Sequence, residues 1–202
     1  MEAAKTEVHP ERTVLFRQGE IPSGVSVVRY GSVKLSMFSS KGRAVILRVA
    51  QQDDMLGLTE FLSGEPSIAT AETLEKTGLG FVERQSLREH LLNDPAMVFR
   101  LAGQASSSYQ FACRQIALFR FSDSVPERVA QFLLDWLVSR PTRRDDTAEL
   151  RLTHEEIAQI IGTSRETVTR TLVTFRKNGW ARISNLNLVV ENRDALEKLA
   201  AS

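Results

Sequence analysis

Two arginines and one glutamate lie within six residues of one another towards the C-terminal end of the chain, at Arg165, Glu166 and Arg170. A guanidinium group donates two parallel hydrogen bonds, which fit the O6 and N7 atoms of guanine, and a carboxylate accepts from the amine of cytosine. Nearby hydroxyl and imidazole groups are suited to phosphate oxygens: Thr153, His154, Ser164 and Thr169. These residue types predict an interface with double-stranded DNA.

Positive charge is concentrated around these residues. The net charge of the whole chain is only +1, so the chain is not the uniformly basic type of nucleic-acid-binding protein. Between Arg151 and Arg182, however, six basic residues stand against three acidic ones. The alternative is that Glu166 and Arg170, which are four residues apart, form only an ion pair on a solvated helix face.

Two helix starts are marked in the sequence around the arginines. Thr153 and Glu156 have the spacing of a capping box, and Thr163 and Glu166 repeat it ten residues later. Gly162 lies between the two boxes and permits a sharp turn. We therefore predict two short helices joined by a tight turn, with the arginines on the second helix.

Small and apolar residues in this segment have the spacing of a helix-turn-helix. Ala158 is small where the helices would cross, Gly162 follows four residues later, and Val168 fills the space between the helices. The apolar side is completed by Ile157, Ile161 and Leu172. After Gly179, which should end the second helix, a hairpin wing is expected from strands Ala181–Ile183 and Leu188–Val190 joined by Ser184–Asn187. The whole motif spans roughly residues 150 to 190.

The N-terminal part of the chain consists of short apolar stretches separated by glycines. Such a pattern, with turns at regular intervals, is typical of a small antiparallel barrel or roll. The expected strands are Thr13–Phe16, Val25–Tyr30, Val33–Phe38, Ala44–Val49, Met55–Leu58, Ile68–Leu74 and Leu79–Val82. With the helices that follow, the fold class is α+β.

Helices connect this β-domain to the helix-turn-helix. A short helix is predicted at Gln85–Leu92, and Asp94-Pro95 begins a long one that ends near Phe121. The long helix carries one apolar stripe, formed by Val98, Leu101, Ala105, Tyr109, Ala112, Ile116 and Phe119. The stripe either packs on its own β-domain or forms a two-chain coiled coil, and we predict a homodimer through this helix. A further helix opens at Ser124–Glu127, and Pro141–Ala148 is a polar connector.

The chain resembles the Crp/Fnr family over nearly its whole length. The strongest likeness is Ser164-Arg165-Glu166-Thr167-Val168-Thr169-Arg170, which is similar to the recognition helix of the cyclic-AMP receptor protein branch. The resemblance implies a cyclic-nucleotide-binding-type β-roll at 1–93, a dimerisation helix at 94–122 and a winged helix-turn-helix at 123–202. It also implies an activator that works with RNA polymerase and uses Arg165, Glu166 and Arg170 to read a palindrome of TGTGA-type half-sites.

The residues that hold cyclic AMP in this family are replaced here. Gly57-Leu58 stands where a Gly-Glu pair would bind the ribose, and Ser67-Ile68 stands where an Arg-Ser pair would bind the phosphate. Ala112-Cys113 replaces the Thr-Ser pair that contacts the base. A buried phosphate without a cation is costly. We therefore expect no cyclic-AMP sensing by the usual mode, although another effector could occupy the same fold.

Other cofactors are also not expected. The single Cys113 excludes a four-cysteine zinc or iron–sulfur site within one chain, and on the long helix we expect it to be buried and inert. His9, His90 and His154 are the only histidines, and solvated or capping roles are expected for them rather than metal or haem ligation. No apolar run approaches the length of a membrane span, and no signal peptide is visible, which favours a cytoplasmic protein.

Two functions remain open from the residues alone. The first is a sequence-specific, DNA-binding transcription regulator, and the second is an effector-binding module that acts through a protein partner. An enzyme is not expected, because no nucleophile and base pair, metal cluster or phosphate loop is visible. The residues Arg165, Glu166 and Arg170 favour the DNA-binding interpretation.

Overall fold

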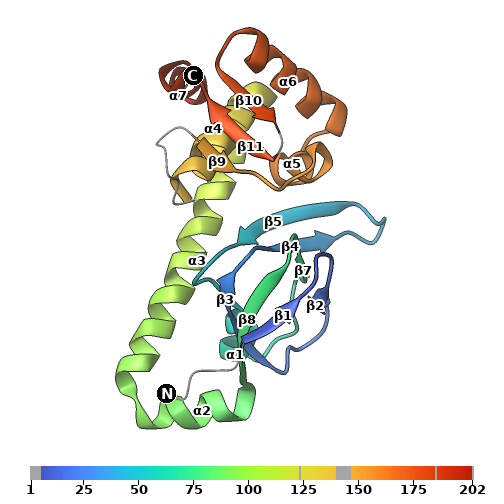
Figure 1. Cartoon of the computed structure of the whole chain (residues 1–202). Coiled ribbons are helices and arrows are strands. Elements are labelled where there is room, and N and C mark those ends of the chain that lie inside the picture. The colour runs from blue at the N-terminus through green and yellow to red at the C-terminus, as the bar shows by residue number, and fades with distance from the viewer. Residues whose placement is uncertain (1–5, 123, 140–146, 185, 202) are drawn as a thin grey trace. The chain divides into compact units, whose positions relative to one another are not determined.

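The chain consists of two compact units in the computed structural model, Met1–Ala112 and Cys113–Ser202 (Figure 1). The structure describes residues 6–122, 124–139, 147–184 and 186–201, with the backbone alone at 118–121 and 139. The two units together form an α+β protein, as the sequence predicted.

The N-terminal unit is a roll of two antiparallel four-stranded sheets, which confirms the predicted β-roll. One sheet has the order β1 (Thr6–His9), β8 (Thr77–Glu83), β3 (Gly24–Tyr30) and β6 (Met55–Leu56). The other has the order β2 (Val14–Phe16), β7 (Thr70–Thr73), β4 (Val33–Phe38) and β5 (Ala44–Ala50). Helices α1 (Leu58–Ser63) and α2 (Arg84–Asn93) complete the roll.

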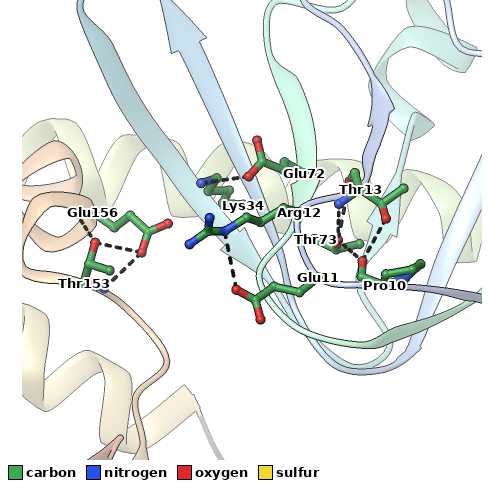
Figure 2. Close-up of polar contacts among 9 residues, drawn as sticks. All are labelled: Pro10, Glu11, Arg12, Thr13, Lys34, Glu72, Thr73, Thr153 and Glu156. Atoms are coloured by element: carbon green, nitrogen blue, oxygen red, sulfur yellow. Dashed lines mark hydrogen bonds and ion pairs between the residues drawn. The ribbon is translucent and has the colours of Figure 1, made fainter.

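Apolar side chains from both sheets fill the interior of the roll. The main cluster comprises Val28, Val33, Ala50, Leu56, Ala71 and Leu79, all of them buried. Polar groups close the end of strand β7, where the buried Thr73 donates a hydrogen bond from Oγ1 to the carbonyl oxygen of Pro10 and accepts one from the Thr13 backbone N–H (Figure 2). Lys34 on β4 and Glu72 on β7 face each other in register and form an ion pair of 3.2 Å. These contacts fix the order of the strands.

Two features of the N-terminal unit differ from the sequence prediction. The predicted strand Met55–Leu58 stops at Leu56, because Gly57 takes a left-handed conformation with φ of 78° and starts helix α1. A Cβ at Gly57 would also approach the backbone oxygen of Gly24 to 2.6 Å. Strand β1 was not predicted at all, since Thr6–His9 has no apolar alternation and is held by backbone pairing with β8.

Helix α3 runs from Pro95 to Phe121 and begins where the sequence predicted. The backbone N–H of Met97 donates to Oδ1 of Asp94, which therefore caps the helix. Leu101 is buried in a cluster with Val25, Leu58 and Leu87 of the N-terminal unit. Val98 is 46% exposed, Tyr109 71% and Ile116 62%, so Leu101 is the buried member of the predicted apolar stripe among the side chains that the structure describes.

Cys113 corrects another prediction. Its side chain is exposed on α3 in the single chain, not buried as the sequence suggested. Its neighbour Ala112 on α3 is exposed as well. No helix within the described ranges is both long and apolar enough to cross a bilayer.

The C-terminal unit combines helices α4 to α7 with a small sheet (Figure 1). Helix α4 (Val125–Ser139) buries Val129, Leu133 and Trp136, and the indole N–H of Trp136 donates to the carbonyl oxygen of Glu149. The sheet has the order β10 (Ala181–Ser184), β11 (Asn187–Val190) and β9 (Thr147–Glu149). The unit also contains α5 (His154–Ile161), α6 (Arg165–Lys177) and a final helix α7 (Arg193–Ala200) that packs on α4.

Strand β9 and helix α7 were absent from the sequence prediction. The predicted connector Pro141–Ala148 lies outside the described residues up to 146, but Thr147 and Ala148 belong to β9. Backbone hydrogen bonds to β11 hold this three-residue strand in place. Helix α7 is capped by Asn192, whose side chain accepts a hydrogen bond from the Ala195 N–H.

Candidate nucleic-acid interface

The capping box predicted for the first helix of the motif is present. Oγ1 of Thr153 accepts a hydrogen bond from the backbone N–H of Glu156, and the Glu156 carboxylate accepts one from the backbone N–H of Thr153 (Figure 2). Helix α5 ends at Gly162, which has φ of 73° and donates its N–H to the Ala158 carbonyl. The left-handed glycine turns the chain sharply into α6, as predicted.

The second predicted capping box is wrong by one residue. Helix α6 is capped by Ser164, whose Oγ accepts from the Thr167 backbone N–H. Thr163 instead belongs to the end of α5, because its N–H donates to the carbonyl oxygen of Ala158. Both residues are good cap formers, and the single-residue connection after Gly162 decides which of them stands at the start of α6.

A core of buried, mostly apolar side chains holds α5 against α6. Ile157, Ala158 and Ile161 on α5 are buried, and so are Val168 and Phe175 on α6. Leu172, which was predicted for this core, is only half-buried, and the neighbouring Thr171 is buried instead. The Phe175 ring also packs against Trp180, with ring centroids 5.5 Å apart. This core fixes the angle at which α6 is presented.

The three predicted base-reading residues share one exposed face of α6. Arg165, Glu166 and Arg170 are all exposed and lie within about one and a half helical turns of one another. A backbone hydrogen bond at its own N–H lowers the pKa of Glu166 below the ordinary value, and a hydrogen bond from Ser164 and the charge of Arg165 act in the same direction. Glu166 is therefore ionised at neutral pH and is a pure hydrogen-bond acceptor.

A residue that the sequence analysis did not select, Thr167, lies among them. Its Oγ1 is 3.4 Å from a terminal nitrogen of Arg170 and 3.1 Å from Oγ of Ser164. Ser164, Thr167 and Arg170 follow one another at i, i+3 spacing, and residues at this spacing are neighbours on a helix. The spacing could therefore have indicated that Thr167 contacts both of the others. Thr167 restricts the side chain of Arg170 before any DNA is present.

The four predicted phosphate contacts divide into two pairs. Thr153 and Ser164 lie at the starts of α5 and α6, where their hydroxyl oxygens accept helix N–H groups. His154 and Thr169 contact each other across the two helices, with Nδ1 of His154 2.9 Å from Oγ1 of Thr169. Thr153, His154 and Ser164 thus lie at the two helix starts, and Thr169 lies about one turn into α6.

The wing forms as predicted, with strands one residue longer than expected. β10 and β11 pair from Ala181 with Val190 to Ser184 with Asn187. Ala181, Leu188 and Val190 are buried, so this hairpin mainly packs against the unit. At its tip Leu186 has φ of 63°, and its carbonyl oxygen accepts a hydrogen bond from the Leu150 N–H.

Ser67 and Ile68 occupy the positions at which the family resemblance places the Arg-Ser pair for the cyclic phosphate. Ser67 is buried, with its hydroxyl 2.6 Å from a carboxylate oxygen of Glu60. Ile68 is 68% exposed, and Leu58 is buried in the apolar cluster with Leu101. An acidic group at this hydroxyl would repel a phosphate. The residues present at these positions therefore do not fit a cyclic nucleotide bound in the usual mode.

Two family models match the chain. A cyclic nucleotide-binding domain matches residues 6–94, and a Crp-like helix-turn-helix domain matches residues 127–199. The CRP-like cAMP-activated global transcriptional regulator of Mycobacterium tuberculosis is 29% identical over 195 residues, which are 95% of this chain and 86% of the relative. The cAMP-activated global transcriptional regulator CRP of Salmonella typhimurium is 29% identical over 81% of this chain and 79% of its own.

Solved structures show the same fold. FixK2 from Bradyrhizobium japonicum aligns with a TM-score of 0.89 and 24% identity over 98% of both chains. The c-di-GMP responsive global regulator CLP of Xanthomonas campestris aligns with a TM-score of 0.76 and 21% identity, over 93% of this chain and 94% of its own.

A cyclic-nucleotide-binding-type roll followed by a winged helix-turn-helix defines a class of DNA-binding transcription regulators. The chain belongs to the Crp/Fnr family within that class. Regulators of this family bind DNA as dimers, and the family consists of transcription regulators, not enzymes.

Replacing the observed cap should destabilise the C-terminal unit, whereas replacing the predicted one should not. Ser164→Ala removes the acceptor for the Thr167 N–H and should lower the free energy of unfolding by about 1 kcal/mol. Thr163→Ala, the matched control, should change it by less than about 0.5 kcal/mol. Urea unfolding followed by tryptophan fluorescence measures this, because both tryptophans, Trp136 and Trp180, lie in the C-terminal unit. Equal losses in the two variants would contradict the assigned cap.

Proposed function

We propose that this protein is a homodimeric transcription regulator that reads a palindrome of TGTGA-type half-sites and binds DNA without cyclic AMP. The exposed row of Arg165, Glu166 and Arg170 on a capped and packed helix is the observation that carries this proposal. A TGTGA half-site offers two guanines to the arginines, and its complementary strand offers cytosine amines to the ionised Glu166. The likeness of Ser164–Arg170 to the recognition helix of the cyclic-AMP receptor branch supports this choice of half-site.

Phosphate contacts supply the remaining part of the interface. Thr153 and Ser164 stand at the N-terminal ends of α5 and α6, where the helix dipoles favour an anion. His154 is the first residue of α5 and contacts Thr169 on α6, and we propose its imidazole as a further phosphate contact. Such contacts set the position of α6 on the duplex, while the base contacts provide the sequence preference.

Dimerisation through α3 supplies the second reading helix. Tyr109 and Ile116 are seven residues apart on α3, which places them on one face of the helix, and both are mostly exposed in the single chain. A large apolar side chain exposed at heptad spacing is typical of a coiled-coil seam. The second copy of the same helix is the occupant that we propose for this face.

Independence from cyclic AMP rests on the roll. The relatives from Mycobacterium tuberculosis and Salmonella typhimurium are named as cAMP-activated, but this chain offers Ser67 and Ile68 where an Arg-Ser pair would hold the phosphate. We further propose that the protein acts in the cytoplasm as an activator together with RNA polymerase, on the strength of the family resemblance.

Removing either arginine should weaken DNA binding in a sequence-dependent way. Arg165→Ala or Arg170→Ala should cost about 1–3 kcal/mol on the palindromic site and relax the preference at one base pair. The measurement is fluorescence anisotropy on the intact palindrome and on single-substitution duplexes. Lys198→Ala, which removes one exposed positive charge from α7, is the control and should leave the base preference unchanged. Equal weakening on every duplex would argue against base reading by the two arginines.

A charge on the exposed stripe of α3 should disrupt the dimer. Ile116→Asp would place an unpaired carboxylate in an apolar seam, and the dissociation constant of the dimer should rise at least about tenfold. Sedimentation velocity over a range of protein concentrations gives this constant. Ser107→Asp is the matched control, because Ser107 is exposed on the other side of the helix. A dimer of unchanged strength in the Ile116 variant would place the interface elsewhere.

Cyclic AMP should not stabilise the protein. A ligand that binds the folded state at a hundred times its dissociation constant adds about 2.7 kcal/mol of stability, and we expect no change in melting temperature or DNA affinity. The Mycobacterium tuberculosis relative, named as cAMP-activated, is the positive control and sets the saturating concentration. A clear thermal shift, or tighter DNA binding with the nucleotide, would overturn this part of the proposal.

A further inference from the structure

The hydroxyl of Thr169 has two hydrogen-bond contacts, one of them with His154, and together they determine which atom donates in each. Nδ1 of His154 lies 2.9 Å from Oγ1 of Thr169, and the same Oγ1 lies 2.9 Å from the carbonyl oxygen of Arg165. The threonine hydroxyl therefore has two partners, one on its own helix and one at the start of α5. A hydroxyl has a single proton, so it can donate to only one of these two partners.

The carbonyl oxygen of Arg165 decides where that proton goes. Two oxygen atoms 2.9 Å apart need a proton between them, and a carbonyl has none to give. The Thr169 hydroxyl therefore donates to Arg165, which is the usual back-bond of a helical threonine. The proton between His154 and Thr169 must then come from the imidazole, so Nδ1 of His154 carries a hydrogen and donates it to Oγ1.

This assignment has a consequence for the other ring nitrogen. In a neutral imidazole only one nitrogen carries a hydrogen, so Nε2 of His154 has a lone pair and is an acceptor. A phosphate oxygen is also an acceptor, and the two repel. Only the imidazolium form has a donor at Nε2 while it still donates from Nδ1 to Thr169.

We propose that His154 contacts a DNA phosphate only in its protonated form, so that DNA binding takes up a proton. This inference rests on the proposed function and deepens it, because it assigns a regulation by pH to the same interface. The phosphate stabilises the imidazolium, and the imidazolium strengthens the phosphate contact. The association constant for DNA therefore increases as the pH falls, because the bound state holds the extra proton.

Other charged groups near α5 must be considered in the same pH range. On α5 itself these are Glu155 and Glu156, of which Glu156 is engaged in the capping box. The helices that pack against α5 carry further charges: Arg165, Glu166, Arg170, Arg176 and Lys177 on α6, and Glu127, Arg128 and Asp135 on α4. Among the described residues, no ion pair joins His154 to any of them, and Thr169 is the recorded hydrogen-bond partner of its ring.

The pKa values of two of these carboxylates, Glu166 and Asp135, differ from the ordinary values. The pKa of Glu166 is lowered by its backbone hydrogen bond, so its charge is constant over the tested range. Burial raises the pKa of Asp135 on α4, while a hydrogen bond from Gln131 and the charge of Arg114 act against that rise. Substituting His154 alone distinguishes a pH dependence that comes from the histidine from one that comes from these carboxylates.

The experiment measures the affinity of the full-length dimer for a palindromic TGTGA duplex from about pH 5.5 to pH 8 at constant ionic strength. Each DNA-bound copy of His154 takes up at most one proton, so the affinity should increase by up to about tenfold per pH unit for each copy engaged. His154→Asn is the key variant, because its amide N–H can replace Nδ1 as the donor to Thr169 but does not titrate. Its affinity should match the wild type at pH 8 and should not increase at low pH.

Two controls make the result specific. The double variant His9→Gln and His90→Gln removes the other two histidines of the chain and should retain the pH dependence. His154→Arg carries a permanent charge and should show a weaker pH dependence than the wild type. Imidazole nitrogen NMR of the free protein at pH 8 should show the hydrogen on Nδ1 of His154.

The possible failures can be told apart. If neither the wild type nor the variants prefer the palindrome at any pH, the proposed function is wrong. If all bind with the same preference and His154→Asn keeps the full pH dependence, only the proton linkage is wrong. A neutral His154 with its hydrogen on Nε2 would likewise overturn the linkage and leave the DNA-binding role intact.

Discussion

Arg165 and Arg170 can read base edges only if their helix is held at a fixed angle, because a guanidinium fork must meet two acceptors at once. The buried, mostly apolar contact between α5 and α6 provides this rigidity. Val168 lies fully buried between the helices, and Gly162 makes the sharp turn that brings them together. The charged face can then remain exposed, since the opposite face of α6 provides the stability.

Much of this arrangement could be predicted from the sequence, because interactions between residues close together in the chain determine it. The Thr153–Glu156 box, the turn at Gly162 and the buried Val168 all depend on residues that are close in the chain. The exposure of Arg165, Glu166 and Arg170 follows from helical periodicity once Val168 is placed in the core. For the same reason the strands of the roll were found near their observed positions, since glycines and apolar alternation mark them locally.

The sequence prediction is wrong where contacts between residues far apart in the chain, or a choice between two neighbouring residues, determine the structure. Thr163 and Ser164 are equally good caps, and only the backbone path after Gly162 selects Ser164. Strands β1 and β9 are held by backbone pairing with strands far away in the chain, so their own residues gave no pattern. Cys113 was expected to be buried because its helix is apolar, but its side chain is exposed in the single chain.

Sequence preference by a symmetric pair of α6 helices is the central claim, and selection from a pool of random duplexes tests it most directly. The purified full-length protein should enrich an inverted repeat of TGTGA-type half-sites whose centres lie about one DNA turn apart. The same selection with Arg165 and Arg170 both replaced by alanine should lose this enrichment. A wild-type protein that enriches no sequence, or a single half-site without its inverted partner, would contradict the account.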